Sequence, residues 1–241
     1  GGGAGPPAFT QSHLQFGNRA ALSRTERALL RAAAPPGGPA ALEGPVAHPC
    51  FHAGYSYTSG GAVFAGSGQP LGCARLLRQL FDRELALSCA ADPDHPGCPP
   101  FRRASPPPPW MEFYALSAAF YIVNFLSFRL GLPGMPRPAL ESVNASAFEL
   151  CRLPWADVVA GPPEPRTPSK KLPQRCFDAQ YLVALLTEGF GFDLGSSQIT
   201  FVEKVGVGQP EWAYGAIAWH LARSPPQHGA GPPSPQHGAG P

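Results

Sequence analysis

Apolar residues recur at helical spacing in several parts of the chain. Over residues 73–83, cysteine, leucine and phenylalanine alternate with arginine and aspartate, which predicts an amphipathic helix. The same spacing predicts helices over residues 140–151 and 175–188, and Gly189 is expected to cap the latter in a left-handed conformation. A further helix is expected to begin at Pro210, because proline suits the first turn of a helix.

Two other stretches predict helices of a less regular kind. Residues 12–33 indicate one broken helix or two short ones, with Ser23 and Glu26 at the spacing of a capping box. Residues 113–128 carry no charged side chain over 16 positions. This stretch is shorter than the roughly 18 to 20 apolar residues of a membrane span, so we expect a buried helix.

Strands are fewer than helices in this pattern. Residues 55–58 and 62–65 flank Ser59-Gly60-Gly61 and predict a β-hairpin. Residues 198–205, QITFVEKV, are rich in β-branched side chains and predict another strand. Several helices with a few strands place the fold in the α/β or α+β class.

Glycine and proline indicate how the chain divides. The 241 residues include 28 Gly and 32 Pro, about a quarter of the chain, whereas 44% are hydrophobic and predict a real core. We expect a flexible end over residues 1–8, a folded lobe over residues 9–223, and a disordered tail over residues 224–241, which repeat Pro-Gln-His-Gly-Ala-Gly-Pro. A net charge of +2 without a basic run argues against a nucleic-acid partner and against binding to an anionic membrane surface.

The chain contains six cysteines, none in a paired Cys-x2-Cys arrangement, so a zinc site is poorly supported. Sequence alone does not choose among the possible disulfide pairings, but closing short loops is economical. Pairing between neighbours, each bond contributing roughly 3 kcal/mol, joins Cys50 to Cys73, Cys89 to Cys98, and Cys151 to Cys176. The alternative is that some of them are free buried thiols, which behave as small hydrophobes.

A glycosylation sequon accompanies these cysteines. Asn144-Ala145-Ser146 fits the acceptor pattern for an N-linked glycan. Disulfides and N-linked glycans form in the same compartments. The sequence therefore favours a secretory lumen or the cell exterior.

Candidate chemistry is confined to a few short patterns. Asp193-Leu194-Gly195-Ser196-Ser197 looks like a phosphate loop, but it follows a helix exit instead of a buried strand, so we interpret it as an ordinary turn. On the helix expected over residues 113–128, Ser117, Tyr121 and Asn124 share one face. Tyr121 either stacks on a nucleobase or packs in a core helix with a local hydrogen-bond partner.

A second aromatic position carries the same ambiguity. Trp212 lies near a helix start, and Gly215 follows it at a spacing that permits either close approach of a ligand or tight helix packing. No HExxH, Walker A, dinucleotide-binding or Gly-x-Ser-x-Gly pattern is present in the sequence.

Taken in order, these segments resemble the C-terminal half of apyrases, the ecto-nucleoside triphosphate diphosphohydrolases. The resemblance covers about residues 9–222 and all six cysteines, and the plant and algal branch is most similar. The segments that carry it are FTQSHLQFG, His48-Pro49-Cys50, FYALSAAFYIVNFL, Cys176-Phe177-Asp178, LLTEGFGFD, ITFVEKV and EWAYGAI.

The resemblance implies an actin- and hexokinase-like fold of two ribonuclease-H-like lobes, of which this chain is one, with several helices, a small mixed sheet and locally paired disulfides. It implies hydrolysis of nucleoside tri- and diphosphates with Ca²⁺ or Mg²⁺. Tyr121 matches the aromatic residue that stacks on the base, and Trp212 and Gly215 match a Trp-x-x-Gly motif. Where animal members place an arginine against the base, this chain has Glu188.

In the family's order, both phosphate loops and the catalytic glutamate precede the segment that residue 9 begins. We therefore expect no catalytic or metal-binding residue in this chain, no hydrolase activity from it alone, and contact with a membrane only through segments outside it. The alternative is a non-catalytic secreted module, derived from the same lobe, that binds a ligand or a protein.

Overall fold

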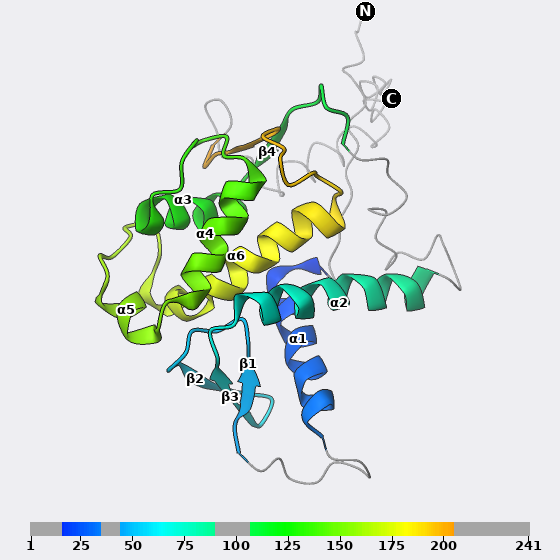
Figure 1. Cartoon of the computed structure of the whole chain (residues 1–241), viewed down its shortest axis with the longest axis vertical. Coiled ribbons are helices and arrows are strands. Elements are labelled where there is room, and N and C mark those ends of the chain that lie inside the picture. Colours follow the sequence, from blue (N-terminus) through cyan, green and yellow to red (C-terminus); the bar gives the residue numbers. More distant parts are fainter. Residues whose placement is uncertain (1–15, 35–43, 90–106, 205–241) are drawn as a thin grey trace, which may run out of the picture. The chain divides into compact units, whose positions relative to one another are not determined.

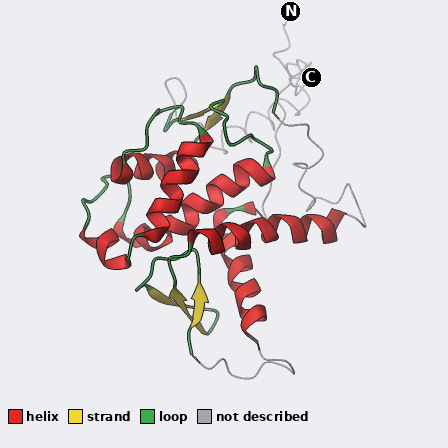
Figure 2. Ribbon diagram, in the orientation of Figure 1, coloured by secondary structure: helices red, strands yellow, loops and turns green. Residues whose placement is uncertain are grey.

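The computed structural model describes residues 16–34, 44–89 and 107–204. The described residues up to Glu203 belong to one compact unit, and most of them are helical (Figures 1 and 2). In chain order, its elements are α1 (Asn18–Ala33), β1 (Val46–His48), β2 (Ser56–Ser59), β3 (Ala62–Gly66), α2 (Pro70–Cys89), β4 (Phe113–Ala115), α3 (Ala118–Leu130), α4 (Leu140–Arg152), α5 (Trp155–Ala160), a 3-10 turn (Ser169–Gln174), α6 (Arg175–Ala184), a π turn (Leu185–Gly189) and β5 (Ile199–Phe201).

The described strands form two small sheets. In the first, of order β1-β3-β2, β1 is parallel to β3 and β2 is antiparallel to it. The expected hairpin is confirmed: Gly60 and Gly61 turn the chain at φ 57° and 82°, values that glycine adopts without strain. In the second sheet, β4 and β5 pair in parallel, with Phe113 opposite Ile199. The strand expected over residues 198–205 is thus present but short.

Helix α6 is central to the packing. It contacts α1, α2, α3 and α4, and Figure 1 shows it between α2 and α4. One apolar cluster joins it to α3, α4 and the second sheet, and a second cluster joins it to α1 and α2. The predicted stripes of α2, α4 and α6 account for this arrangement, since their buried faces include Leu77, Val143, Leu150, Phe177 and Leu182. The expected combination of several helices with a few strands is confirmed in the described residues.

The single helix expected over residues 113–128 is wrong at its start. Phe113–Ala115 form strand β4, and the helix begins only at Ala118. Between them Ser117 adopts φ 54°, which is uncommon for a residue with a side chain. The uncharged run therefore combines a strand and a helix, because hydrophobicity alone does not distinguish a strand from a short buried helix. No helix in the described ranges is long and apolar enough to cross a membrane.

The capping box expected at Ser23 and Glu26 is also wrong. Residues 18–33 form one helix whose N-cap is Gly17, so Ser23 and Glu26 lie inside it. Glu26 is buried and accepts hydrogen bonds from the hydroxyls of Tyr57 (3.0 Å) and Ser59 (2.9 Å) on strand β2. The spacing between Ser23 and Glu26 therefore does not reflect a capping box, because the contacts with strand β2 fix the Glu26 side chain.

The end of α6 differs from the expected left-handed cap at Gly189. The helix widens into the π turn Leu185–Gly189, and the left-handed residue is Gly191, at φ 74°. The amide of Phe190 donates to the carbonyl of Leu185, and that of Phe192 donates to the carbonyl of Leu186. The helical end is thus extended by the π turn, and the left-handed residue lies two positions beyond the expected Gly189.

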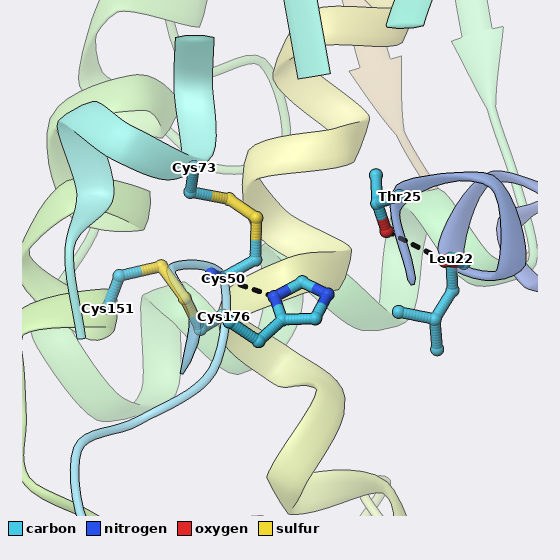
Figure 3. The surroundings of a disulfide bond; sticks show 7 residues. Leu22, Thr25, Cys50, Cys73, Cys151 and Cys176 are labelled. Carbon is cyan, nitrogen blue, oxygen red and sulfur yellow. Dashed lines mark hydrogen bonds between the residues drawn. A yellow bond between two sulfur atoms is a disulfide. The ribbon is translucent and has the colours of Figure 1, made fainter. Parts of the chain in front are cut away.

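Two of the expected disulfides are confirmed. Cys50 is bonded to Cys73 and Cys151 to Cys176, and all four side chains are fully buried (Figure 3). The first bond ties the segment after β1 to α2, and the second ties the end of α4 to the start of α6. The expected bond to Cys98 lies outside the described residues, as do the flexible end over residues 1–8 and the tail over residues 224–241.

Candidate functional site

The candidate site centres on Tyr121, in the first turn of α3. The side chain is half-buried, and its hydroxyl donates to Glu203 Oε1 at 3.3 Å. The neighbouring ring of Phe120 packs edge-on, with ring centroids 5.4 Å apart and planes at 64°. Strand β5 ends at Phe201 beside β4, which leads into α3. The small second sheet therefore brings Glu203 to the tyrosine.

The shared face of Ser117, Tyr121 and Asn124 is only partly a polar site. Asn124 Nδ2 donates to Glu164 Oε1 at 3.0 Å, from the loop that follows α5. Ser117 is exposed, and its hydroxyl does not cap the helix. The structure thus gives both Tyr121 and Asn124 a carboxylate partner, and each partner lies far along the sequence.

The loop that carries Glu164 also contacts Glu203, the carboxylate that accepts the Tyr121 hydroxyl. Glu164 is 4% exposed and accepts a second hydrogen bond, at 3.0 Å, from the amide of Arg166. The guanidinium of Arg166 lies 3.8 Å from Glu203 Oε2. Glu164, Arg166 and Glu203 were not among the residues expected from sequence, because each meets its partner through tertiary contacts.

A buried polar cluster lies behind this loop, at the start of α6. Arg175 and Asp178, 5% and 4% exposed, form an ion pair at 3.5 Å. Arg175 Nη2 also donates to Thr167 Oγ1 at 2.8 Å, and Asn18 Nδ2 donates to Asp178 Oδ1 at 2.6 Å. Burial raises the pKa of the Asp178 carboxyl and lowers the pKa of Arg175, against the opposing effect of each charge on the other.

A second buried group lies beside the first disulfide. His48 is fully buried, and burial lowers its pKa from 6.5 to about 4, so the ring is neutral at physiological pH. Its Nδ1 atom accepts the backbone N–H of Cys50 at 3.2 Å. This bond and the rings of Phe51 and Phe64 around it give His48 a structural role in the first sheet.

The interpretation of residues 193–197 as an ordinary turn is supported by their hydrogen bonds. The amide of Gly195 donates to Asp193 Oδ1 at 2.7 Å, and the amide of Ser196 donates to the Asp193 carbonyl at 2.9 Å. The carbonyls of Leu194 and Ser196 accept amides from the first turn of α4. These amides are engaged within the turn, so they do not form a cradle for phosphate oxygens.

Glu188, in the π turn, is also engaged. Its carboxylate pairs with Arg78 of α2 at 3.2 Å, and both side chains line a pocket of about 160 Å³ between α2, α4 and α6. Asn144 of the sequon lines the same pocket and is half-buried, while Ser146 is 9% exposed. Glycosylation of Asn144 stays a prediction. Trp212 and Gly215 lie outside the described residues.

Comparison with known proteins places this geometry in context. The model of the GDA1/CD39 (nucleoside phosphatase) family matches residues 7–228. The chain is 30% identical over 233 residues to ectonucleoside triphosphate diphosphohydrolase 8 of Bos taurus, covering 88% of the chain and 42% of the relative. It is 30% identical over 204 residues to the Homo sapiens protein of that name, covering 76% of the chain and 36% of the relative. It is 32% identical over 157 residues to ectonucleoside triphosphate diphosphohydrolase 2 of Homo sapiens, covering 63% of the chain and 28% of the relative. The chain thus spans less than half the length of each of these relatives.

Proposed function

Because the chain belongs to the GDA1/CD39 (nucleoside phosphatase) family, we propose that it contributes the nucleoside-binding lobe of a hydrolase that releases phosphate from nucleoside tri- and diphosphates. The bovine and human relatives are named ectonucleoside triphosphate diphosphohydrolases, which favours a phosphoanhydride bond as the bond cleaved. The observation that carries the proposal is the half-buried Tyr121 ring, which Glu203 holds by its hydroxyl.

In the proposed site, Tyr121 stacks on the nucleobase through one face of its ring. Phe120 covers an edge of that ring, and Glu203 and Asn124 hold polar contacts on the same side of α3. A ring supported in this way offers a π-face to any base, so stacking does not require hydrogen bonds that read the base. Trp212 and Gly215 complete the substrate side in this proposal, within an actin- and hexokinase-like fold.

Ca²⁺ or Mg²⁺ is the proposed cofactor for the hydrolysis, where a divalent ion would polarise phosphoryl oxygens. Residues 16–34, 44–89 and 107–204 contain no group of three His, Cys, Asp or Glu side chains placed to hold a metal ion. No step of the reaction is therefore assigned to the described residues through the ion. Their proposed part is to bind and orient the nucleoside.

We propose an oxidising location for the protein, in a secretory lumen or outside the cell. Two buried disulfides support it, since such bonds persist in those compartments. The sequon at Asn144 lies on α4 with its side chain half-buried, and N-linked glycosylation there is part of the same proposal.

Replacement of Tyr121 by alanine tests the proposed base contact. We expect the dissociation constant for ADP to rise about tenfold, because loss of one base-stacking ring costs about 1–3 kcal/mol. Isothermal titration calorimetry on the full chain measures this change. The matched control is Tyr114→Ala, which removes a 55% exposed tyrosine from strand β4. Equal affinities of wild type and Tyr121→Ala would contradict the assignment.

We further propose that the 241-residue chain alone binds nucleotide without hydrolysing it. The turn over residues 193–197 supports this, because the amides of Gly195 and Ser196 donate within the turn and are not free to stabilise a transferring phosphoryl group. Nucleotide binding without turnover is also what a non-catalytic module would show. Sustained phosphate release from ATP or ADP by this chain with Ca²⁺ would contradict the proposal.

A further inference from the structure

The carboxylate of Glu203 connects the candidate stacking ring to a cation from another part of the chain. Its Oε1 accepts the Tyr121 hydroxyl at 3.3 Å, and its Oε2 lies 3.8 Å from Arg166 Nε. The Glu203 side chain is 35% exposed and that of Arg166 is 50% exposed. The pair is therefore accessible to water and contributes little to the overall stability of the fold.

The backbone of Arg166 is held by hydrogen bonds, although its side chain is half exposed to solvent. Its amide donates to Glu164 Oε1 at 3.0 Å, and the same oxygen accepts Asn124 Nδ2 from α3. The amide of Thr167 donates to the Glu164 carbonyl at 3.0 Å, and the Thr167 hydroxyl accepts Arg175 Nη2. The turn over residues 164–167 is thus fixed to α3 by a part-buried hydrogen bond and to α6 by a buried one. Because the backbone is fixed, the position from which the Arg166 side chain extends toward Glu203 is fixed as well.

We propose that Arg166 and Glu203 are positioning residues that hold the Tyr121 ring in its nucleoside-binding orientation. The inference rests on the proposed function, in which this ring stacks on the base. A tyrosine side chain that is free to rotate loses rotamer entropy when a ligand orders it, which weakens binding. A side chain that is already held in the binding orientation avoids this cost. Arg166 orients the Glu203 carboxylate, and the carboxylate orients the hydroxyl. Neither residue needs to touch the nucleotide.

The proposal predicts a non-additive effect in a double-mutant cycle. Glu203→Ala and Tyr121→Phe each break the hydroxyl contact, so each is expected to raise the dissociation constant for ADP about threefold to tenfold. The double variant is expected to bind like either single variant, because no contact remains to be lost. Arg166→Ala should give a smaller rise. The matched control is Glu149→Ala, which removes an exposed carboxylate from α4.

A second measurement follows the ring directly. In the full chain with labelled tyrosine, the Tyr121 ring signal is assigned from its loss in Tyr121→Phe, and its order is measured by NMR relaxation without nucleotide. We expect an ordered ring in the wild type and in Glu149→Ala, and increased ring motion in Glu203→Ala. An equally ordered ring in Glu203→Ala would overturn the proposal. So would additive losses of ADP affinity in the cycle.

The two readouts separate this inference from the proposed function. If Tyr121→Ala leaves ADP affinity unchanged, the base contact itself is wrong, and the positioning role for nucleotide falls with it even where ring order depends on Glu203. If Tyr121→Ala weakens binding but Glu203→Ala does not, the base contact stands and the positioning role is wrong. Weaker binding in both, with non-additivity, supports the inference.

Discussion

Replacement of Asp178 by leucine lowers the free energy of unfolding by about 3–5 kcal/mol, because it leaves the buried Arg175 without its partner. Arg175 is 5% exposed, lies 5.3 Å from the Phe125 ring centroid, and donates to Thr167. The hydrogen bond from Asn18, which ties α1 to α6, is lost in the same variant. Urea denaturation at neutral pH, followed by circular dichroism, measures the change.

The matched control replaces both partners. In Arg175→Met with Asp178→Leu, neither charge of the pair stays buried, so at least half of the lost stability should return. Burial raises the pKa of Asp178 and lowers that of Arg175, so desolvation disfavours the charged form of both groups. A double variant no more stable than Asp178→Leu would show that the ion pair is not the source of the effect.

Loss of the disulfide between Cys151 and Cys176 lowers the free energy of unfolding by about 3 kcal/mol in the alanine double variant. The two cysteines are 25 residues apart and join α4 to α6, the helices at the centre of the larger apolar cluster. Without the bond, the unfolded chain regains the freedom of that loop. Urea denaturation of wild type, this variant and the exposed control Ser169→Ala measures the difference. A loss below about 1 kcal/mol would contradict the argument from chain entropy.

Local patterns predict the parts of the fold that depend on neighbouring residues. Apolar spacing locates α2, α4 and α6, since each buries one face. Gly60 and Gly61 predict the hairpin, because its turn requires positive φ angles. Closing short loops predicts both disulfides that the structure describes.

Local patterns do not predict contacts that only tertiary structure creates. Ser117 at positive φ divides an uncharged run into a strand and a helix, and no sequence pattern marks that residue as the boundary. Glu26 sits at capping-box spacing but serves two hydroxyls of β2. At the candidate site, the shared helix face selects Tyr121 as a candidate, whereas its hydrogen-bond partner Glu203 lies 82 positions away in the sequence. Polar partners at such separations follow from the packed fold, not from spacing.

The most direct test of the central claim compares ADP with pyrophosphate at the Tyr121 ring. If the chain binds the nucleoside through that ring, ADP shifts the assigned Tyr121 ring signal in NMR spectra of the labelled chain in a saturable manner. Pyrophosphate at the same concentrations leaves the signal in place, because it has no base to stack. A Tyr121 signal that ADP does not move, or that pyrophosphate moves equally, would contradict the account.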